Sequence, residues 1–391
     1  MSQRPISLSK DLQQLREDGY DIKIQAGYLL LMDVPYVNAR CEILRGTLVS
    51  KLNLAGDVTL QPEDHVAYFA GQQPCDSKGS PLTKIITTST RTTLADGVTI
   101  DHAFSAKPTT PYKDYCEKMK SYVALLTNHA EAIDGSATAK TYPVVPPEDE
   151  NSVFKYEDTA SSRANIAAIT QKLAVDNIAI VGLGGTGSYV LDLIAKTPVH
   201  IVHLYDGDRF SQHNAFRSPG APSIEDLRGF NNKAAYFQSL YSRMHNNIIV
   251  HPYYIDATNV KELCDARFVF LCIDVNASRK LIVGHLETFG VPFIDVGMGV
   301  PRTEDALGGI LRVTTSTPAQ RAHVPHRVPF ADTDQENEYN RNIQIADLNA
   351  LNAALAVIKW KKFCGFYRDT RNEHHATYTV AANMLLNEEE A

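Results

Sequence analysis

The first third of the chain alternates short apolar runs with polar turn residues, a pattern typical of β-strands. The strand-like runs read DIKIQAGYLLLMDVPYV, CEILRGTLVSKLNL, DHVAYFAG and KIITTSTRTTL, and Gly, Pro and Asp separate them. A helix is predicted over about residues 112–132, where apolar side chains recur at spacings of three and four. The pattern therefore predicts a small α+β domain.

A polar stretch over residues 133–152, IDGSATAKTYPVVPPEDENS, is rich in Pro, Ser and acidic residues. Such a composition is typical of a linker. We therefore expect two domains, over residues 1–150 and 151–391. A chain of 391 residues is long enough for two separate cores.

The second part alternates apolar strands with helices. The runs NIAIVGL, VHIVHLYDGD, RFVFLCID and PFIDVGMG predict strands, with helices over 185–196 and 277–289 between them. This rhythm predicts an α/β domain with a Rossmann-like, doubly wound and mostly parallel sheet. A later helix, over 345–363, carries Leu348, Leu351, Leu355 and Ile358, and we expect this face to pack on the sheet or on a partner subunit.

Four glycines stand between the first of these strands and its helix. Gly182, Gly184, Gly185 and Gly187 form the pattern G-x-G-G-x-G. Glycine permits a sharp turn that brings backbone N–H groups close to a phosphate at a helix N-terminus. The loop does not choose the nucleotide, because Asp206 follows at the distance where an acid holds the ribose of NAD.

Charged and amide side chains follow the ends of successive predicted strands, where ligands of such sheets bind. They are Asp206, Asp208, Asn214, Arg217, Lys233, Asp274, Asn276 and Arg279. NAD needs an acid for its ribose and little other charge. ATP with magnesium needs cations for its phosphates and an acid for the metal, and this set supplies both.

In this combination the sequence resembles the ThiF-type adenylyltransferase family, which includes ubiquitin-activating enzymes and activators of bacterial sulfur-carrier proteins. The family's G-x-G-G-x-G, D-x-D, N-x-x-R, Lys and D-x-x-x-x-R signatures occur in order over roughly residues 160–365. The resemblance implies ATP- and Mg²⁺-dependent adenylation of the C-terminal carboxylate of a ubiquitin-like protein. It places this step in a bacterial ubiquitination-like pathway, with antiviral defence as one setting. The alternatives are activation of a sulfur carrier and an NAD-dependent oxidoreductase.

The resemblance also implies roles for single residues. It places Asp206 on the ribose, Asp208 beside the nucleotide, and Asp274 on magnesium. Asn214, Arg217 and Lys233 would meet the phosphates, with Asn276 near the nucleotide. Arg163, in SSRANI, would reach the γ-phosphate, and in the family's homodimers this arginine comes from the other subunit. The chain departs from the pattern where Val275 follows the metal aspartate and where Ser218 follows Arg217.

Many relatives pass the acyl group on to a cysteine of the crossover segment. Residues 298–341 contain no cysteine here, and the six cysteines of the chain form no C-x-x-C pair. Cys75 lies in a Gly- and Pro-rich loop that we expect to be exposed, where a thiolate could form. His65 precedes it by ten residues, a spacing that loosely resembles ubiquitin-conjugating enzymes. The alternative is an ordinary loop cysteine.

Overall charge and hydrophobicity limit the partners. The formal net charge of −7 does not support non-specific nucleic-acid binding. No run of about 18 apolar residues and no signal-peptide pattern is visible, so we expect a cytoplasmic protein without membrane contact. The expected partners are a ubiquitin-like protein, a second copy of the chain and, in one scheme, a separate conjugating enzyme. The N-terminal domain is expected to be an accessory module, with a conjugating-enzyme-like fold as one interpretation.

Overall fold

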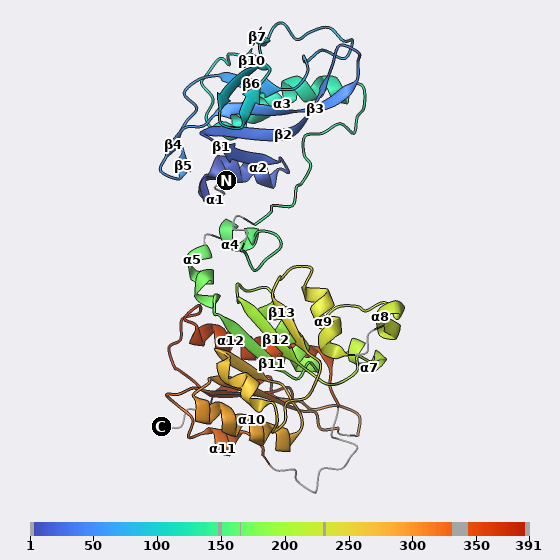
Figure 1. Cartoon of the computed structure of the whole chain (residues 1–391), viewed down its shortest axis with the longest axis vertical. Coiled ribbons are helices and arrows are strands. Elements are labelled where there is room, and N and C mark those ends of the chain that lie inside the picture. Colours follow the sequence, from blue (N-terminus) through green and yellow to red (C-terminus); the bar gives the residue numbers. More distant parts are fainter. Residues whose placement is uncertain are drawn as a thin grey trace. The chain divides into compact units, whose positions relative to one another are not determined.

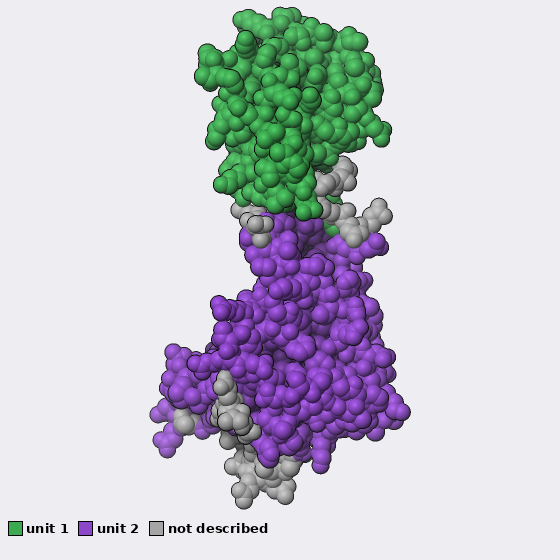
Figure 2. Space-filling model, turned by 90° about the vertical axis from the view of Figure 1, so that its left-hand side faces the viewer, with its two compact units in different colours: residues 1–150 green, residues 151–391 purple. Residues whose placement is uncertain are grey.

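In the computed structural model the chain forms two compact units, residues 1–150 and 151–391 (Figure 2). The structure describes residues 4–147, 151–164, 166–229, 232–302, 304–330 and 343–387. Unit 1 and unit 2 have hydrophobic cores made of different residues. Each can therefore be considered as a folding unit in its own right.

Unit 1 is built on a six-stranded antiparallel sheet with the order β1-β2-β3-β6-β10-β7 (Figure 1). Its strands are β1 (Ile22–Gln25), β2 (Tyr28–Val37), β3 (Ile43–Lys51), β6 (Val66–Ala70), β7 (Ile86–Thr88) and β10 (His102–Ser105). Two small hairpins add β4 (Leu54–Ala55) with β5 (Val58–Thr59), and β8 (Thr92–Ala95) with β9 (Val98–Ile100). The strand-like runs of the sequence are thus confirmed.

Helices cover one face of this sheet. The predicted helix is α3 (Tyr115–Glu131), and it begins where the Asp114 carboxylate accepts a hydrogen bond from the Glu117 N–H at 2.9 Å. Met119 and Tyr122 of α3 are fully buried in the core of unit 1. Two further helices, α1 (Arg4–Leu8) and α2 (Lys10–Glu17), were not predicted. Their sequences are mostly polar, and only a few apolar residues such as Leu12 are buried.

Unit 2 contains an eight-stranded sheet with the order β13-β12-β11-β14-β15-β16-β17-β18. The first five strands in this order are parallel, and the last three are antiparallel. They are β11 (Asn177–Val181), β12 (Ile201–Tyr205), β13 (Ile248–His251), β14 (Phe268–Leu271), β15 (Phe293–Gly299), β16 (Ile310–Ser316), β17 (His375–Thr379) and β18 (Met384–Asn387). The predicted α/β fold with a mostly parallel sheet is confirmed.

Alternate residues of the central strand β11 face two different layers. Ile178 and Ile180 belong to the core beneath α6 (Gly185–Ile194), α9 (Lys233–Tyr241) and α12 (Ala346–Phe363). Ala179 and Val181 belong to the core beneath α10 (Asn276–Phe289) and η2 (Val260–Asp265). The helical segments of unit 2 are α4 (Thr159–Arg163), α5 (Ala167–Thr170), η1 (Gln171–Leu173), α6 (Gly185–Ile194), α7 (Gln212–Ala215), α8 (Ile224–Gly229), α9 (Lys233–Tyr241), η2 (Val260–Asp265), α10 (Asn276–Phe289), α11 (Val324–Arg327) and α12 (Ala346–Phe363). Across the described ranges of both units, no helix is long and apolar enough to cross a membrane.

The packed face of α12 agrees only in part with the predicted one. Leu348 is buried and Leu355 packs against the core, as predicted, but Leu351 and Ile358 are exposed. Asn349, Ala353 and Trp360 are fully buried instead. The helix lies so close to the start of α6 that a Cβ on Gly185 would overlap the Asn349 side chain. Close helix approach requires small or polar side chains at the contact, and this requirement overrides the leucine pattern.

Three histidines of unit 2 have lowered pKa values. Burial lowers the pKa of His245, and its Nε2 lies 2.9 Å from the Val199 carbonyl oxygen while its Nδ1 accepts from the Asn247 N–H. Burial likewise lowers the pKa of His203 and of His251, whose facing nitrogens are 3.0 Å apart. The fold therefore favours the neutral form of all three imidazoles.

We expect the free energy of unfolding of unit 2 to fall as the pH drops below about 6.5. Below that pH the unfolded chain binds protons at these histidines, whereas the folded chain, with its lowered pKa values, does not. Urea midpoints at several pH values between 7.5 and 5.5 measure the effect. A His245→Gln variant should flatten the pH dependence, while the exposed His213→Gln should not. A midpoint that rises on acidification would contradict the assignment.

Candidate functional site

The glycine loop joins β11 to α6 at the carboxyl end of the sheet. Gly182 has a left-handed φ of +87°, and a Cβ there would lie 2.7 Å from the Cys272 carbonyl oxygen. A Cβ on Gly187 would overlap the Gly182 carbonyl oxygen. These two positions therefore require glycine for the turn itself. Gly184 differs, because a Cβ there would meet no atom within 4 Å, so open space lies beside the backbone at the start of α6.

Asp206 ties the end of β12 to this loop. Its Oδ2 accepts from the Leu183 N–H at 2.7 Å, and its Oδ1 accepts from the Asp208 N–H at 2.8 Å. The residue is only 6% exposed. Burial raises the pKa of Asp206, and the charge of Lys233 opposes that shift. Asp206 thus fixes the position of the glycine loop relative to the acidic turn over residues 206–208.

Lys233 and Asp208 form an ion pair beside Asp206. Lys233 begins α9 behind the N-cap Asn232, and its Nζ lies 2.5 Å from Asp208 Oδ2 and 4.0 Å from Asp206 Oδ1. Burial pushes the pKa of Asp208 upward, but hydrogen bonds from Lys233 and Tyr254 outweigh it, and the pKa lies below its usual range. A buried ammonium is thereby placed at the carboxyl edge of the sheet.

Asn214 and Arg217 stand on and directly after α7. The Asn214 Oδ1 accepts from the Ser211 N–H at 2.8 Å in a capping box. Within the part of the chain that the structure describes, Asn214 Nδ2 and Arg217 Nε are buried without a hydrogen-bond partner. Burial lowers the pKa of Arg217, while the nearby carboxylates of Asp274 and Asp208 oppose this shift. Buried donors without partners are costly, so these two groups favour an anionic ligand.

Asp274 lies on the loop between β14 and α10. Its side chain is exposed. The described residues contain no cluster of three or more His, Cys, Asp or Glu that could hold a metal ion. A single exposed carboxylate still fits magnesium in one respect, because this ion commonly takes one or two carboxylates and completes its shell with phosphates and water.

The buried Asp295 stabilises the Asp274 loop through Arg279. Asp295 of β15 is fully buried and bonds Arg279 Nε at 3.0 Å and Arg312 Nη2 at 2.6 Å. Arg279 also donates to the Ile273 carbonyl oxygen and to Asn276 Oδ1. Arg279 is therefore structural, and the Asn276 side chain, predicted to face the nucleotide, accepts from Arg279 instead. Neither Asp295 nor Arg312 was identified from the sequence as part of the site. The one feature that could have indicated Asp295 is its position as an acidic residue inside the apolar run PFIDVGMG.

Arg163 and Cys75 complete the set of predicted site residues. Arg163 ends α4, and its side chain lies outside the described residues. Cys75 belongs to unit 1, where its backbone pairs with Val37 and Pro81, and it is only 1% exposed. Burial raises the pKa of the Cys75 thiol. The expectation that Cys75 is exposed is therefore wrong. His65, ten residues earlier, lies with its Nε2 2.9 Å from the Ser105 hydroxyl.

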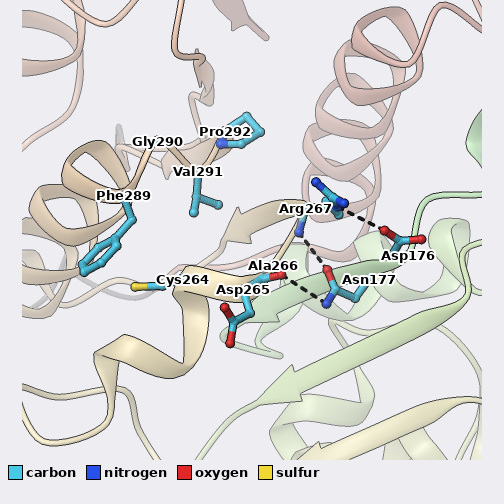
Figure 3. A pocket seen from close by; sticks show the side chains of 10 residues that line it. All are labelled: Asp176, Asn177, Cys264, Asp265, Ala266, Arg267, Phe289, Gly290, Val291 and Pro292. Carbon is cyan, nitrogen blue, oxygen red and sulfur yellow. Dashed lines mark hydrogen bonds and ion pairs between the residues drawn. The ribbon is translucent and has the colours of Figure 1, made fainter.

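The structure also contains a pocket at the opposite, amino edge of the unit 2 sheet (Figure 3). It has a volume of about 480 Å³. Three of its polar side chains are paired: Asn177 bonds the backbone of Asp265 and of Arg267, and Arg267 pairs with Asp176 at 3.1 Å. The charged groups of the candidate site therefore lie at the other edge, where the glycine loop is.

A parallel α/β sheet with a glycine loop, an acidic turn and buried cations at its carboxyl edge defines a nucleotide-binding protein of the Rossmann type. The ThiF family model matches residues 159–364, more than half of the chain. The chain therefore belongs to the ThiF family. Residues 10–159 match a domain of unknown function, DUF6791.

Solved structures give fold-level similarities. Escherichia coli MccB with MccA-N7isoASN is 19% identical with a TM-score of 0.46, over 57% of this chain and 67% of that one. E. coli MccB with ATP is 17% identical with a TM-score of 0.46, over 62% and 73%. Selenomethionine PaaA is 15% identical with a TM-score of 0.47, over 86% and 97%. No curated protein matches the sequence.

Proposed function

We propose that the protein adenylates the C-terminal carboxylate of a ubiquitin-like protein with ATP and magnesium. The observation that carries the proposal is a pair of buried donors, Asn214 Nδ2 and Arg217 Nε, which have no hydrogen-bond partner among the described residues. Arg217 also lies within electrostatic range of Asp208, the carboxylate that pairs with Lys233. A triphosphate supplies the acceptors that these donors lack. Membership of the ThiF family supports the same class of ligand.

Each predicted residue then has a distinct task. Asp206 holds the ribose side of the site through the glycine loop, and Arg217 and Lys233 bind phosphate oxygens. Lys233 must exchange its contact with Asp208 for one with phosphate, which the exposed position of Asp208 permits. Arg163 is proposed to add a further cation from the partner subunit of a homodimer. Magnesium on Asp274 would neutralise charge on the leaving phosphates.

The chemistry needs positioning and charge neutralisation rather than a protein nucleophile. A carboxylate oxygen of the partner attacks the α-phosphorus of ATP, the bond from that phosphorus to the bridging oxygen breaks, and pyrophosphate leaves. Both reactants are anionic, so Arg217 and Lys233 lower the barrier by screening their repulsion. No proton has to move in this step. The acyl group can then pass from the adenylate to a separate conjugating enzyme or, in the sulfur-carrier alternative, to a sulfur donor, and AMP leaves in either case.

An NAD-dependent oxidoreductase is less well supported by the site. Asp206 does not separate the two nucleotides, because its carboxylate would lie at the ribose of NAD and of ATP alike. The site also contains two cations, the buried Lys233 and the partly buried Arg217. Together they provide more positive charge than the pyrophosphate of a dinucleotide requires. The accessory unit, residues 1–150, is proposed to dock the protein partner or the conjugating enzyme.

The test is exchange of labelled pyrophosphate into ATP by the full-length chain. We expect exchange with magnesium and a ubiquitin-like protein from the same genome that keeps its free C-terminal carboxylate. The same partner with an amidated C-terminus should give none, because the attacking oxygen is absent. ATP binding without exchange for every such partner would contradict the proposal. A thermal shift with NAD but not ATP would instead favour the oxidoreductase.

A further inference from the structure

Strand order predicts which strand end lies nearest the base of a bound nucleotide. The glycine loop follows β11, the acidic turn follows the neighbouring β12, and β13 is the next strand along the edge. A nucleotide with phosphates at the first position and ribose at the second extends its base toward the third. This reasoning rests on the proposed function, and it directs attention to the segment directly after His251, the last residue of β13.

Two successive tyrosines of that segment make different contacts. Tyr253 donates to Glu262 at 2.8 Å and lies 3.0 Å from His251 Nδ1, whereas Tyr254 donates to Asp208 Oδ1 in the candidate site. The Tyr254 carbonyl oxygen accepts from Asn259 Nδ2 at 2.9 Å. The segment is thus held by its own hydrogen bonds, and Tyr254 is presented to the site on a fixed backbone.

The ring of Tyr254 lies directly on the acidic turn. A Cβ on Gly207 would lie 2.8–3.0 Å from three of its ring carbons, so only glycine allows this approach. The residue is nevertheless 63% exposed. The hydrogen bond to Asp208 raises the pKa of the phenol to about 12, with burial and the charges of Asp206 and Asp274 adding to it. A protonated, oriented aromatic ring therefore stands among the three carboxylates.

We propose that Tyr254 contacts the nucleobase by stacking and thereby sets the preference of this site for a nucleoside triphosphate over a bare polyphosphate. Aromatic side chains stack on the flat face of any base, and an exposed aromatic ring on a fixed backbone is suited to this contact. The hydroxyl has a second task. By donating to Asp208, it keeps the ring in place over the acidic turn.

A purely structural role for Tyr254 predicts a different result. If the ring only covered the Asp208–Lys233 pair, its loss would change binding of every phosphate ligand through Lys233. A base contact affects only ligands that carry a base. Comparing ATP with inorganic tripolyphosphate separates these two roles, because both present three linked phosphates to Arg217 and Lys233.

The experiment measures the Kd of ATP and of inorganic tripolyphosphate by calorimetry, with magnesium and the full-length chain. Tyr254→Ala should weaken ATP binding about tenfold or more and leave the tripolyphosphate Kd unchanged. Tyr254→Phe keeps the ring and should bind ATP within about threefold of the wild type. Tyr253→Phe is the matched control, and it should change neither constant, because the Tyr253 hydroxyl bonds Glu262 and His251.

Equal weakening of both ligands in Tyr254→Ala, or no weakening of either, would overturn the inference. Pyrophosphate exchange distinguishes this failure from failure of the proposed function. A wild type that exchanges pyrophosphate while Tyr254→Ala binds ATP normally refutes the base contact alone. A wild type that binds ATP through Tyr254 but never exchanges pyrophosphate refutes the adenylation alone.

Discussion

Replacing Asp274 by alanine should lower the rate of pyrophosphate exchange on the order of 100- to 1,000-fold. The proposed carboxylate ligand of magnesium is lost, and the negative charge that develops on the leaving pyrophosphate is no longer neutralised. The fold should not suffer, because the Asp274 side chain is exposed and no hydrogen bond or ion pair to its carboxylate occurs among the described residues. The exchange assay at saturating ATP and partner measures the effect, with a melting temperature to confirm folding.

Asp265→Ala is the matched control for this substitution. Asp265 is also an exposed aspartate of unit 2, but it lines the pocket at the amino edge of the sheet (Figure 3). Exchange should stay close to that of the wild type. Raising the magnesium concentration should partly restore Asp274→Ala if the lost group is a metal ligand. Full exchange by Asp274→Ala at low magnesium would disprove the role assigned to it.

Replacing Asp295 by alanine should lower the free energy of unfolding of unit 2 by about 3–5 kcal/mol. The fully buried carboxylate pairs with Arg279 and Arg312, and its loss leaves two guanidinium groups without their counter-charge. Urea denaturation followed by circular dichroism measures the change. Because Arg279 also holds the Ile273 carbonyl, the Asp274 loop should loosen as well, and the apparent affinity for magnesium should fall.

Asp176→Ala provides the comparison for a surface pair. Asp176 and Arg267 lie 3.1 Å apart, but both side chains are about 70% exposed. Water already solvates this pair, so its loss should cost less than about 1 kcal/mol. If Asp295→Ala and Asp176→Ala cost the same, burial does not determine the strength of the Asp295 pair, and the assigned support of the Asp274 loop is wrong.

Much of the candidate site could be predicted from the chain because its parts are local. The glycine loop and the Asp206–Asp208 turn each occupy a few consecutive residues next to a strand, and strand and helix periods are visible over about ten residues. In a parallel sheet the ends of successive strands lie along one edge, so Lys233 and Asp274 could be assigned to the site before their positions were known. The same locality explains why the mostly parallel fold was predicted correctly.

Long-range contacts could not be predicted in this way. The Tyr254 hydroxyl donates a hydrogen bond to Asp208, which lies 46 residues earlier in the chain. The Asp295 carboxylate pairs with Arg279 of α10 and Arg312 of β16. Cys75, expected in an exposed loop, is buried because its backbone pairs with Val37, and α12 packs through Asn349 because Gly185 allows a close approach. Turn chemistry and periodicity act within one element, whereas burial and pairing depend on which elements meet, and only the tertiary fold decides that.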